Sequence, residues 1–517
     1  MSAAASRSRG HPRLGVLSRA LRSLRVMRAS FFERVLDSDA WVIAERAFRA
    51  HRERPIRRAP APRAPATDLE RALEALDAAL AVGAVETAAT ESERVLGELR
   101  SASSAGLRSR AIAAAIEVRI ALGDRDGAAS LAHEHASTLE RTARGVTVLD
   151  LLGARDATSY WLPDGRANAV AIARDVERGR LDADGVLATM VRRPTVLLRD
   201  PQLHLLVANA TGEREGARTA RALTRVLRAY GLPGVAHAHR SHDLLESLAF
   251  EPGAPTHDGP LVSIVVSAYR AERTIRHAMD SLLAQSHRAI EILACDDASD
   301  DGTWSILRER YGDDPRVRLF RSRANQGTYN IRNALLERAR GELLTFHDAD
   351  DVAHPARIAR QVATLRRTGA ESCTTSCVRI DPDGRAVFFR DQSAVRLAVV
   401  SLMTTRSAYE AVGPFRRARF GADLELLEDL RLRAPIARDR APLLLVAWSS
   451  TSMTRSAAAQ SLEDGYRSPA RRAYAELARA KRRGEITSTE LDARLRAMGN
   501  YAEPSGVDEH RAHGRTA

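Results

Sequence analysis

The chain has 517 residues, of which 44% are hydrophobic, and this suits a soluble protein of two or three domains. Lys and Arg (79) outnumber Asp and Glu (66), which gives a formal net charge of +13. No basic block is interleaved with aromatic residues, so nucleic-acid binding is not expected. Three cysteines are too few for a disulfide framework and indicate a reducing compartment. No apolar run reaches the roughly 18–20 residues of a membrane-spanning helix, and we expect a cytoplasmic protein.

Residues 1–60 form an Arg-rich leader. Leucines recur in it at helical spacing with arginines between them, at Leu14, Leu17, Leu21 and Leu24. A basic amphipathic helix of this kind can lie on the anionic inner face of a membrane. The pattern is equally that of a leader with no such role, and both interpretations stay open.

Residues 68–250 carry helical patterns after a Pro-rich linker at 55–65. Leucines at 69, 73, 76 and 80 line one face of a predicted helix. Residues 111–136, interrupted by a Leu-Gly-Asp turn at 122–124, are predicted to form two antiparallel helices, weakly similar to a tetratricopeptide hairpin. We expect this region to pack against the next domain or a partner.

Residues 251–260 are a Pro/Gly linker, after which strand and helix patterns alternate. Apolar runs predict strands and amphipathic runs predict helices between them. The strands are 261–267, 290–295, 317–320 and 343–346, and the helices are 272–285, 303–311 and 327–340. This alternation predicts a parallel sheet, whose ligand lies beyond the carboxyl ends of the strands.

Acidic clusters follow two of these strands, at 296–301 and 347–351. Carboxylates gathered at one edge of a sheet repel one another unless a cation or hydrogen-bond donors neutralise them. Mg²⁺ or Mn²⁺ prefers oxygen ligands and takes one or two carboxylates together with substrate phosphates. Asp348 and Asp350 have a spacing that allows them to share such a ligand, although an isolated D-x-D sequence is more often a solvated turn.

Four segments in order resemble the family 2 glycosyltransferases, which are inverting enzymes with a GT-A fold. They read VSIVVSAY, DDASDDGT, NQGTYNIRN and HDADDVAHPARIARQV, and the resemblance covers residues 261–455. It implies an α/β fold class, a Rossmann-like GT-A domain at 261–455 preceded by an all-α helical region. Residues 456–517 are then expected to be a helical or disordered tail.

The resemblance also implies roles for donor-binding residues. Tyr269 is expected against the nucleobase and Asp297 in a hydrogen bond to it. The neighbouring Asp296 matches a motif carboxylate, and Asp301 matches a third acid that binds the donor or stabilises the loop. Ser299 and Asp300 are ordinary turn residues.

Further along, Gly327 allows the backbone to turn near the nucleotide, and Arg332 reaches a phosphate or the acid cluster. Asp348 resembles the ribose-binding acid and Asp350 the metal ligand, with Mg²⁺ or Mn²⁺ as the cofactor. His347 and His354 are expected to be structural.

Inversion requires a base facing the acceptor hydroxyl, opposite the leaving diphosphate. The segment Gly421–Leu426 resembles the G-E-D-x-D-L stretch of the family, with Asp423 as the base and Glu425 as a second acid. It departs from the family at Ala422. Asp423 is also suited to a helix N-terminus, where the helix dipole favours a carboxylate. Residues 452–455 resemble a closing segment in which Arg455 contacts the diphosphate.

These patterns predict transfer of a sugar from a nucleotide-diphosphate donor to a hydroxyl of a glycan or lipid-linked acceptor. The enzyme is expected in cell-surface polysaccharide or glycoconjugate synthesis, in the cytoplasm or peripherally on the inner membrane face. Two alternatives remain: an inactive transferase-like scaffold acting through its helical region, and a nucleotidyltransferase. The segment 268–272 lacks the glycines that a nucleotidyltransferase usually has there. The sugar, base, acceptor and linkage are not determined by the sequence.

Overall fold

The computed structural model describes most of the chain from residue 67 to residue 510. The described ranges are 67–82, 85–152, 200–210, 216–238, 248–252, 259–388, 393–448 and 469–510, with a few separate residues between 172 and 186 and at 245. The predicted leader at 1–60, the linker at 55–65 and Arg455 lie outside the described residues.

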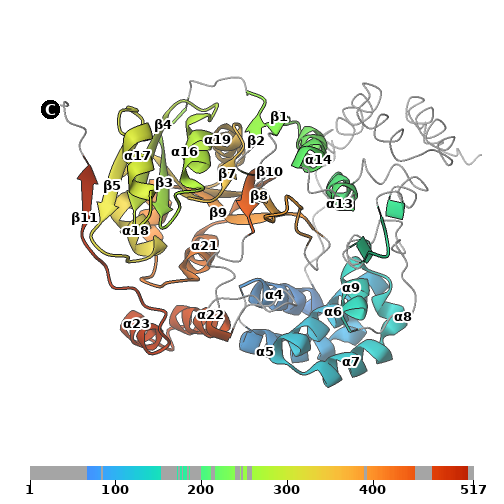
Figure 1. Ribbon diagram of the computed structural model, residues 1–517. Coiled ribbons are helices and arrows are strands. Elements are labelled where there is room, and N and C mark those ends of the chain that lie inside the picture. Colours follow the sequence, from blue (N-terminus) through green and yellow to red (C-terminus); the bar gives the residue numbers. More distant parts are fainter. Residues whose placement is uncertain are drawn as a thin grey trace, which may run out of the picture.

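A mixed sheet forms the centre of the fold (Figure 1). Within the described residues it has nine strands in the order β11-β5-β4-β3-β6-β9-β8-β10-β7. Four of them run parallel and confirm the predicted strands: β3 (Val262–Ala268), β4 (Ile290–Asp296), β5 (Val317–Ser322) and β6 (Leu343–Asp348). The others are β7 (Val352–Ala353), β8 (Ser372–Ile380), β9 (Val395–Thr405), β10 (Ala437–Ala447) and β11 (Val507–His510).

Helices cover both faces of the sheet, because successive side chains of a strand point to opposite faces. In β3, Ile264 and Val266 join one buried core with helices α16 (Ile275–Leu283) and α19 (Arg357–Thr368). Val265 joins a second core on the other face. This second core contains residues of α18 (Thr328–Leu336), α20 (Arg406–Val412), α21 (Ala422–Arg433), α22 (Pro469–Arg482) and α23 (Ser488–Ala497). Helix α17 (Thr303–Tyr311) packs on the first face.

The sheet extends beyond the predicted boundary at residue 455. Strand β11 pairs antiparallel with β5, with Val507 opposite Ser322 and His510 opposite Leu319. The described part of this segment, residues 469–510, therefore contains an edge strand of the central sheet as well as helices. Strand β11 has four residues, and its two central ones are Asp508 and Glu509. It therefore lacks the alternating apolar pattern from which a strand is predicted.

The first part of the chain forms a helical unit, which we define as residues 68–151. It contains α4 (Asp68–Val82), α5 (Val85–Gly97), a short 3₁₀ turn (Leu99–Ser101), α6 (Ala105–Leu122), α7 (Arg125–Glu134), α8 (Ala136–Leu139) and α9 (Ala143–Leu151). Leu69, Leu73 and Leu76 are buried as predicted. The predicted helix pair is also present: α6 ends at Gly123, with φ 84°, and Asp124 caps α7.

The described residues between 200 and 252 pack on the sheet. Helices α13 (Leu203–Asn209) and α14 (Gly216–Ala229) share a buried core with residues of β8 and β10. The Asn209 amide donates to the Ala386 carbonyl at 2.7 Å and accepts from its N–H at 3.0 Å. The expectation of helix up to residue 250 is wrong at β1 (Val235–Ala238) and β2 (Leu248–Phe250), which form a small hairpin. Strands this short leave no readable period.

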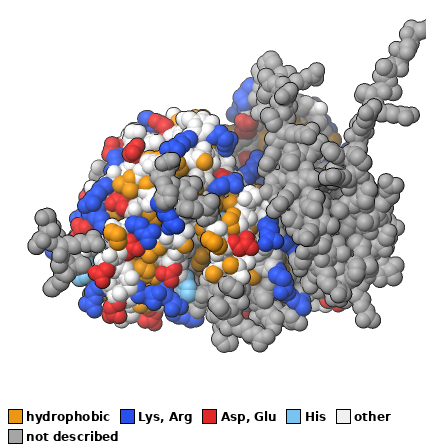
Figure 2. Space-filling model, turned by 90° about the horizontal axis from the view of Figure 1, so that it is seen from above, with side chains coloured by type: hydrophobic (Ala, Val, Ile, Leu, Met, Phe, Trp, Pro, Cys, Tyr) orange, Lys and Arg blue, Asp and Glu red, His pale blue; other side chains and the backbone are white. Residues whose placement is uncertain are grey.

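The surface carries no simple charge division on the side seen in Figure 2, where basic and acidic side chains are interspersed over the described residues. Among the helices of the described ranges, none is both long and apolar enough to cross a bilayer.

Candidate active site

An exposed aromatic ring marks the carboxyl end of β3. Tyr269 is 45% exposed. Arg270 follows it with a φ of 49°, a conformation that non-glycine residues seldom adopt. The Arg270 guanidinium lies 5.3 Å from the centre of the Tyr269 ring and makes two 2.7 Å bonds to Asp300. The partly exposed ring thus lies at the predicted ligand edge of the sheet.

The two acids that end β4 hold neighbouring loops in place. Both oxygens of Asp297 accept backbone N–H groups, from Gln326 at 3.0 Å and from Gly327 at 2.8 Å. Burial raises the pKa of Asp297, and these two donors oppose the rise. Asp296 is buried and accepts from Arg321 at 3.1 Å and from the Ser299 N–H at 3.2 Å. Both carboxylates therefore have protein partners already.

Gly327 makes the Asp297 contact possible. Its φ is +80°, in the region that glycine adopts without steric cost, and it immediately precedes α18. The predicted backbone turn is present, and its N–H points at Asp297.

Asp301 has the loop-stabilising contacts foreseen as its alternative role. It accepts from the Thr303 hydroxyl at 2.6 Å, from the Thr303 N–H at 3.0 Å and from the Glu272 N–H at 3.2 Å. These bonds satisfy donors at the start of α17 and tie the loop after β4 to the loop after β3.

A buried arginine orients the acid at the end of β6. Arg332 lies among three aromatic rings, those of Tyr329, Phe346 and Phe415, with its guanidinium carbon 5.3–5.8 Å from their centres. It donates to Asp348 at 2.6 Å. Of the two roles predicted for Arg332, the structure shows the contact with the acid cluster. The Asp348 side chain remains 44% exposed, so one buried partner fixes a carboxylate that still faces solvent.

Two further acids follow Asp348 and are poorly neutralised by protein groups. Burial and the charge of Asp348 raise the pKa of Asp350 to about 6. Asp351 is buried, and its pKa is raised well above the usual range by burial and then by Asp350. One Asp351 oxygen accepts from the Ala447 N–H at 3.3 Å, and the other has no hydrogen-bond partner among the described residues. This excess of carboxylate oxygen is what a hard divalent cation would offset.

The two nearby histidines have structural contacts. Arg357 donates to His347 Nδ1 at 3.1 Å, so the ring proton is on Nε2, which donates to the Asp351 carbonyl at 3.2 Å. In His354, Nδ1 accepts from the Ala356 N–H and Nε2 donates to the Pro233 carbonyl, both at 3.1 Å. Burial lowers the pKa of His354 to about 4 and the pKa of His347 well below its usual value. Both rings are therefore neutral at pH 7 and have a structural role.

Asp423 lies in the first turn of α21 (Ala422–Arg433). Gly421, with φ 91°, precedes this helix. The Tyr329 hydroxyl donates to Asp423 at 2.9 Å and accepts from the Gly421 N–H at 3.2 Å. Burial and then the Asp423 charge raise the Tyr329 pKa, so this hydroxyl remains a donor. Tyr329 and Arg332 are three residues apart on α18, and this helix therefore contacts both Asp423 and Asp348.

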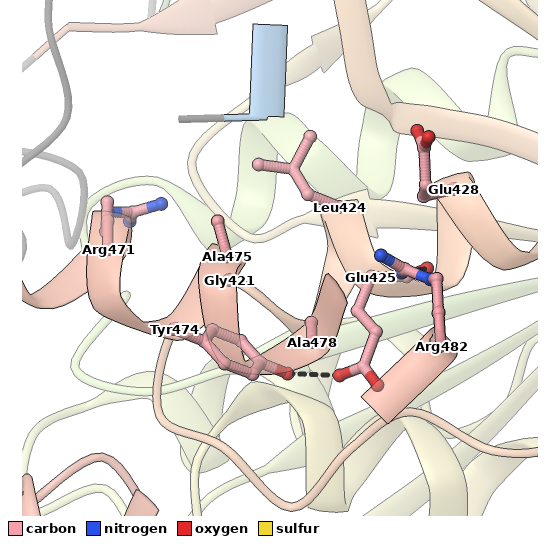
Figure 3. A pocket seen from close by; sticks show the side chains of 9 residues that line it. All are labelled: Gly421, Leu424, Glu425, Glu428, Arg471, Tyr474, Ala475, Ala478 and Arg482. Carbon is pink, nitrogen blue, oxygen red and sulfur yellow. Dashed lines mark hydrogen bonds between the residues drawn. The ribbon is translucent and has the colours of Figure 1, made fainter. Parts of the chain in front are cut away.

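Glu425 faces elsewhere. Residues two apart on a helix project from different sides, and Glu425 is 7% exposed against α22. It accepts from the Tyr474 hydroxyl at 2.5 Å (Figure 3) and lies 3.4 Å from Arg416 and 3.7 Å from Lys481. Glu425 therefore does not share the face of α21 on which Asp423 contacts Tyr329. Tyr474 was not foreseen, because nothing in the sequence links it to a residue 49 positions earlier.

No group of three or more His, Cys, Asp or Glu residues in the described ranges is arranged to hold a metal by itself. Two carboxylates completed by phosphate oxygens remain compatible with Mg²⁺ or Mn²⁺, which are often bound in this way.

Part of the chain is similar in sequence to known proteins. Residues 263–425 match the family described as Glycosyl transferase family 2. The succinoglycan biosynthesis protein ExoO of Rhizobium meliloti is 33% identical over 144 residues, 28% of this chain and 41% of its own. The Escherichia coli enzyme WfaP, named a UDP-Glc:alpha-D-GlcNAc-diphosphoundecaprenol beta-1,3-glucosyltransferase, is 35% identical over 102 residues, 20% of this chain and 40% of its own.

A solved structure, S. aureus TarS 1–349 in complex with UDP-GlcNAc, aligns with a TM-score of 0.35 and 18% identity, over 46% of this chain and 71% of that one. The sequence relatives named above are matched over about two fifths of their own length. Residues 263–425 form a domain that matches glycosyl transferase family 2, and this match covers about a third of the chain. Its fold class is the predicted GT-A type with a preceding helical region.

Proposed function

We propose that the protein transfers a sugar from a nucleotide-diphosphate donor to an acceptor hydroxyl with inversion at the anomeric carbon. The observation that carries this proposal is the double contact of α18. Its Arg332 orients Asp348 at the end of β6, and its Tyr329 orients Asp423 at the start of α21. A donor-binding acid and a candidate base are thereby held by one rigid element, as a two-substrate reaction requires.

On the donor side, Tyr269 would stack against the base and Asp348 would bind the ribose. Asp297 has both oxygens committed to Gln326 and Gly327. We therefore assign Asp297 first to shaping the nucleotide loop, with a bond to the base as an additional role of the same carboxylate.

Asp350 would hold Mg²⁺ or Mn²⁺ together with the donor diphosphate. The fit rests on the raised pKa of Asp350 and on the unpartnered oxygen of Asp351, which show that carboxylate charge exceeds the protein's own donors there. When bound, such a cation stabilises the negative charge that develops on the leaving diphosphate.

On the acceptor side, Asp423 would remove the proton from the attacking hydroxyl. The new bond joins the acceptor oxygen to the anomeric carbon, and the bond to the diphosphate oxygen breaks with its electron pair leaving on the diphosphate. The bond from Tyr329 occupies Oδ1 of Asp423 and leaves Oδ2 to accept the proton.

The acceptor is proposed to be a lipid-linked or polysaccharide intermediate, handled at the inner face of the membrane. The name of WfaP, which specifies a UDP-sugar donor and a lipid-diphosphate acceptor, and the polysaccharide role named for ExoO support this choice.

Thermal shift with nucleotide sugars tests donor binding. UDP-glucose, UDP-N-acetylglucosamine, UDP-galactose, GDP-mannose and dTDP-rhamnose are each added with Mn²⁺, and at least one should raise Tm, because a ligand of the native state stabilises it by mass action. Asp350→Ala should remove the Mn²⁺ dependence, whereas Asp383→Ala, at an exposed turn, should not.

The products separate the alternatives. A glycosyltransferase releases a nucleoside diphosphate, while a nucleotidyltransferase forms or consumes pyrophosphate. Absence of a thermal shift with all five donors would refute the proposal in favour of an inactive scaffold.

A further inference from the structure

Helix α22 touches the start of the helix that carries Asp423. The Tyr474 ring lies on Gly421: a Cβ added to this glycine would be 2.5 Å from Cδ1 of the ring. The hydroxyl of the same tyrosine donates to Glu425 at 2.5 Å (Figure 3). One buried side chain therefore contacts both ends of the segment 421–425, with Asp423 at its centre.

Additional contacts fix α22 along α21. Arg482 donates to Asp429 at 2.6 Å and to the Glu425 carbonyl at 2.9 Å. Ala478 is buried in the same core as Leu426 and Leu430 of α21. The two helices thus move as one body, because a shift of α22 would break a buried hydrogen bond, an ion pair and apolar packing together.

The opposite side of α22 contacts the helical unit. Glu476 accepts from the Thr87 N–H at 2.9 Å and from the Thr87 hydroxyl at 2.7 Å. Arg472 donates to the Ala121 carbonyl of α6, and Ala475 packs against the core formed by α4, α5 and α6. Figure 1 shows α22 between α21 and α5.

We propose that the helical unit positions the catalytic base through α22, with Tyr474 as the positioning residue for Asp423. This inference rests on the proposed function, because it takes Asp423 as the base. It gives residues 68–151 a role in catalysis without placing any of them at the substrate. Since small displacements of a reacting group are costly in rate, a loosened α22 lowers turnover while donor binding at the strand ends is unchanged.

The test measures hydrolysis of the donor selected by the thermal-shift panel, divided by the concentration of sites that bind the nucleoside diphosphate of that donor, found by calorimetric titration. Loss of folded protein lowers both quantities equally and leaves this ratio constant. Tyr474→Phe keeps the ring on Gly421 and removes the bond to Glu425. We expect about a tenfold decrease in turnover per site with unchanged donor KM.

Tyr311→Phe is the matched control. The Tyr311 hydroxyl also bonds a carboxylate, Asp280, at 2.7 Å, but it lies on α17, on the other face of the sheet. Its turnover per site should equal that of the wild type. Equal turnover per site in wild type and Tyr474→Phe would overturn the role of Tyr474.

Glu476→Ala tests the helical unit and leaves Tyr474 intact. It removes both Thr87 bonds and should lower turnover per site in the same direction as Tyr474→Phe, by a smaller factor. Glu485→Ala, which breaks only the exposed pair with Arg483, should have no effect. Unchanged turnover in Glu476→Ala would refute the coupling to the helical unit.

Asp423→Asn separates the two hypotheses. If it retains wild-type turnover, the assignment of the base fails. If it is inactive while Tyr474→Phe and Glu476→Ala turn over normally, the proposed function stands and only this inference fails.

Discussion

The acids at the strand ends and the acid on α21 are held in different ways. Asp348 is held by Arg332, 16 residues earlier, and Asp297 by the N–H of Gly327, 30 residues later. Asp423 is held by Tyr329, 94 residues earlier, and Glu425 by Tyr474, 49 residues later. The two proposed donor-binding acids thus have partners at most 30 residues away, whereas the proposed base and Glu425 have partners 94 and 49 residues away. Motifs within a short stretch of sequence can indicate the nearby partners of the strand-end acids. The distant partners of Asp423 and Glu425 depend on how the helices pack.

The largest effect should come from the base side. Asp423→Asn removes the proton acceptor but keeps the shape of the side chain, and we expect turnover to fall by about 10²–10⁴-fold. The measurement is nucleoside diphosphate release at saturating donor. Glu428→Gln, on the same helix but paired with Arg431 of that helix, should stay within a small factor of the wild type. Comparable losses in both variants would show that the helix, and not its first acid, matters.

Near the strand ends, Asp297→Asn should mainly lower the free energy of unfolding. An amide cannot accept from both N–H groups through two oxygens, so one buried donor is left facing an NH₂ group. Leaving a buried polar group unsatisfied costs about 1–3 kcal/mol in the free energy of unfolding, measurable with urea. Asp300→Asn, which weakens only the exposed pair with Arg270, should change the free energy of unfolding much less, because solvent screens that pair. Equal losses would contradict the loop role of Asp297.

His354, which is buried shortly after Asp351 in the chain, should make stability depend on pH. His354 has a folded-state pKa of about 4, lowered by burial from 6.5, so the unfolded chain binds its proton first as the pH falls. The stabilisation from neutral His354 is complete above pH 6.5 and is lost as the pH falls from 6.5 to 4. At pH 5 the loss amounts to about 2 kcal/mol in the free energy of unfolding. Urea unfolding at pH 7 and pH 5 measures it, and His354→Asn should show a smaller difference. An identical difference would assign the effect to other groups.

The smallest expected change concerns the helix junction. Gly421→Ala places a Cβ against Tyr474 at a φ of 91°, and the left-handed conformation alone costs about 1–2 kcal/mol for an alanine. Thermal unfolding should show this loss, while Gly369→Ala, also at positive φ but with open space around it, reports the backbone cost alone. The excess of the first over the second measures the contact with Tyr474. No excess would mean that the ring moves freely.

Much of the donor side could be predicted from the sequence. Apolar runs identified β3, β4, β5 and β6, and the acids that follow them lie at the shared edge because parallel strands end there together. Arg332 was predicted to reach either a phosphate or the acid cluster, and the structure shows the second contact. The loop-stabilising alternative for Asp301 also matches its observed bonds.

The base side could be read only in part. The sequence located Asp423 but also proposed Glu425 as a companion acid, and spacing alone could not show that Glu425 faces Tyr474. It also ended the domain at 455 and extended helix to 250, whereas β11 joins the sheet and β1 pairs with β2. These short strands form because partner edges are available, which a local pattern does not encode.

The sequence by itself determined the order of strands and helices and the acids placed at the strand ends, because hydrophobic periodicity and turn chemistry act within a few residues. The tertiary structure alone decided the partners of Asp423 and Glu425. Tyr329 and Tyr474 reach these carboxylates from 94 and 49 residues away, and only packing of α18, α21 and α22 on one face of the sheet brings them within hydrogen-bonding distance.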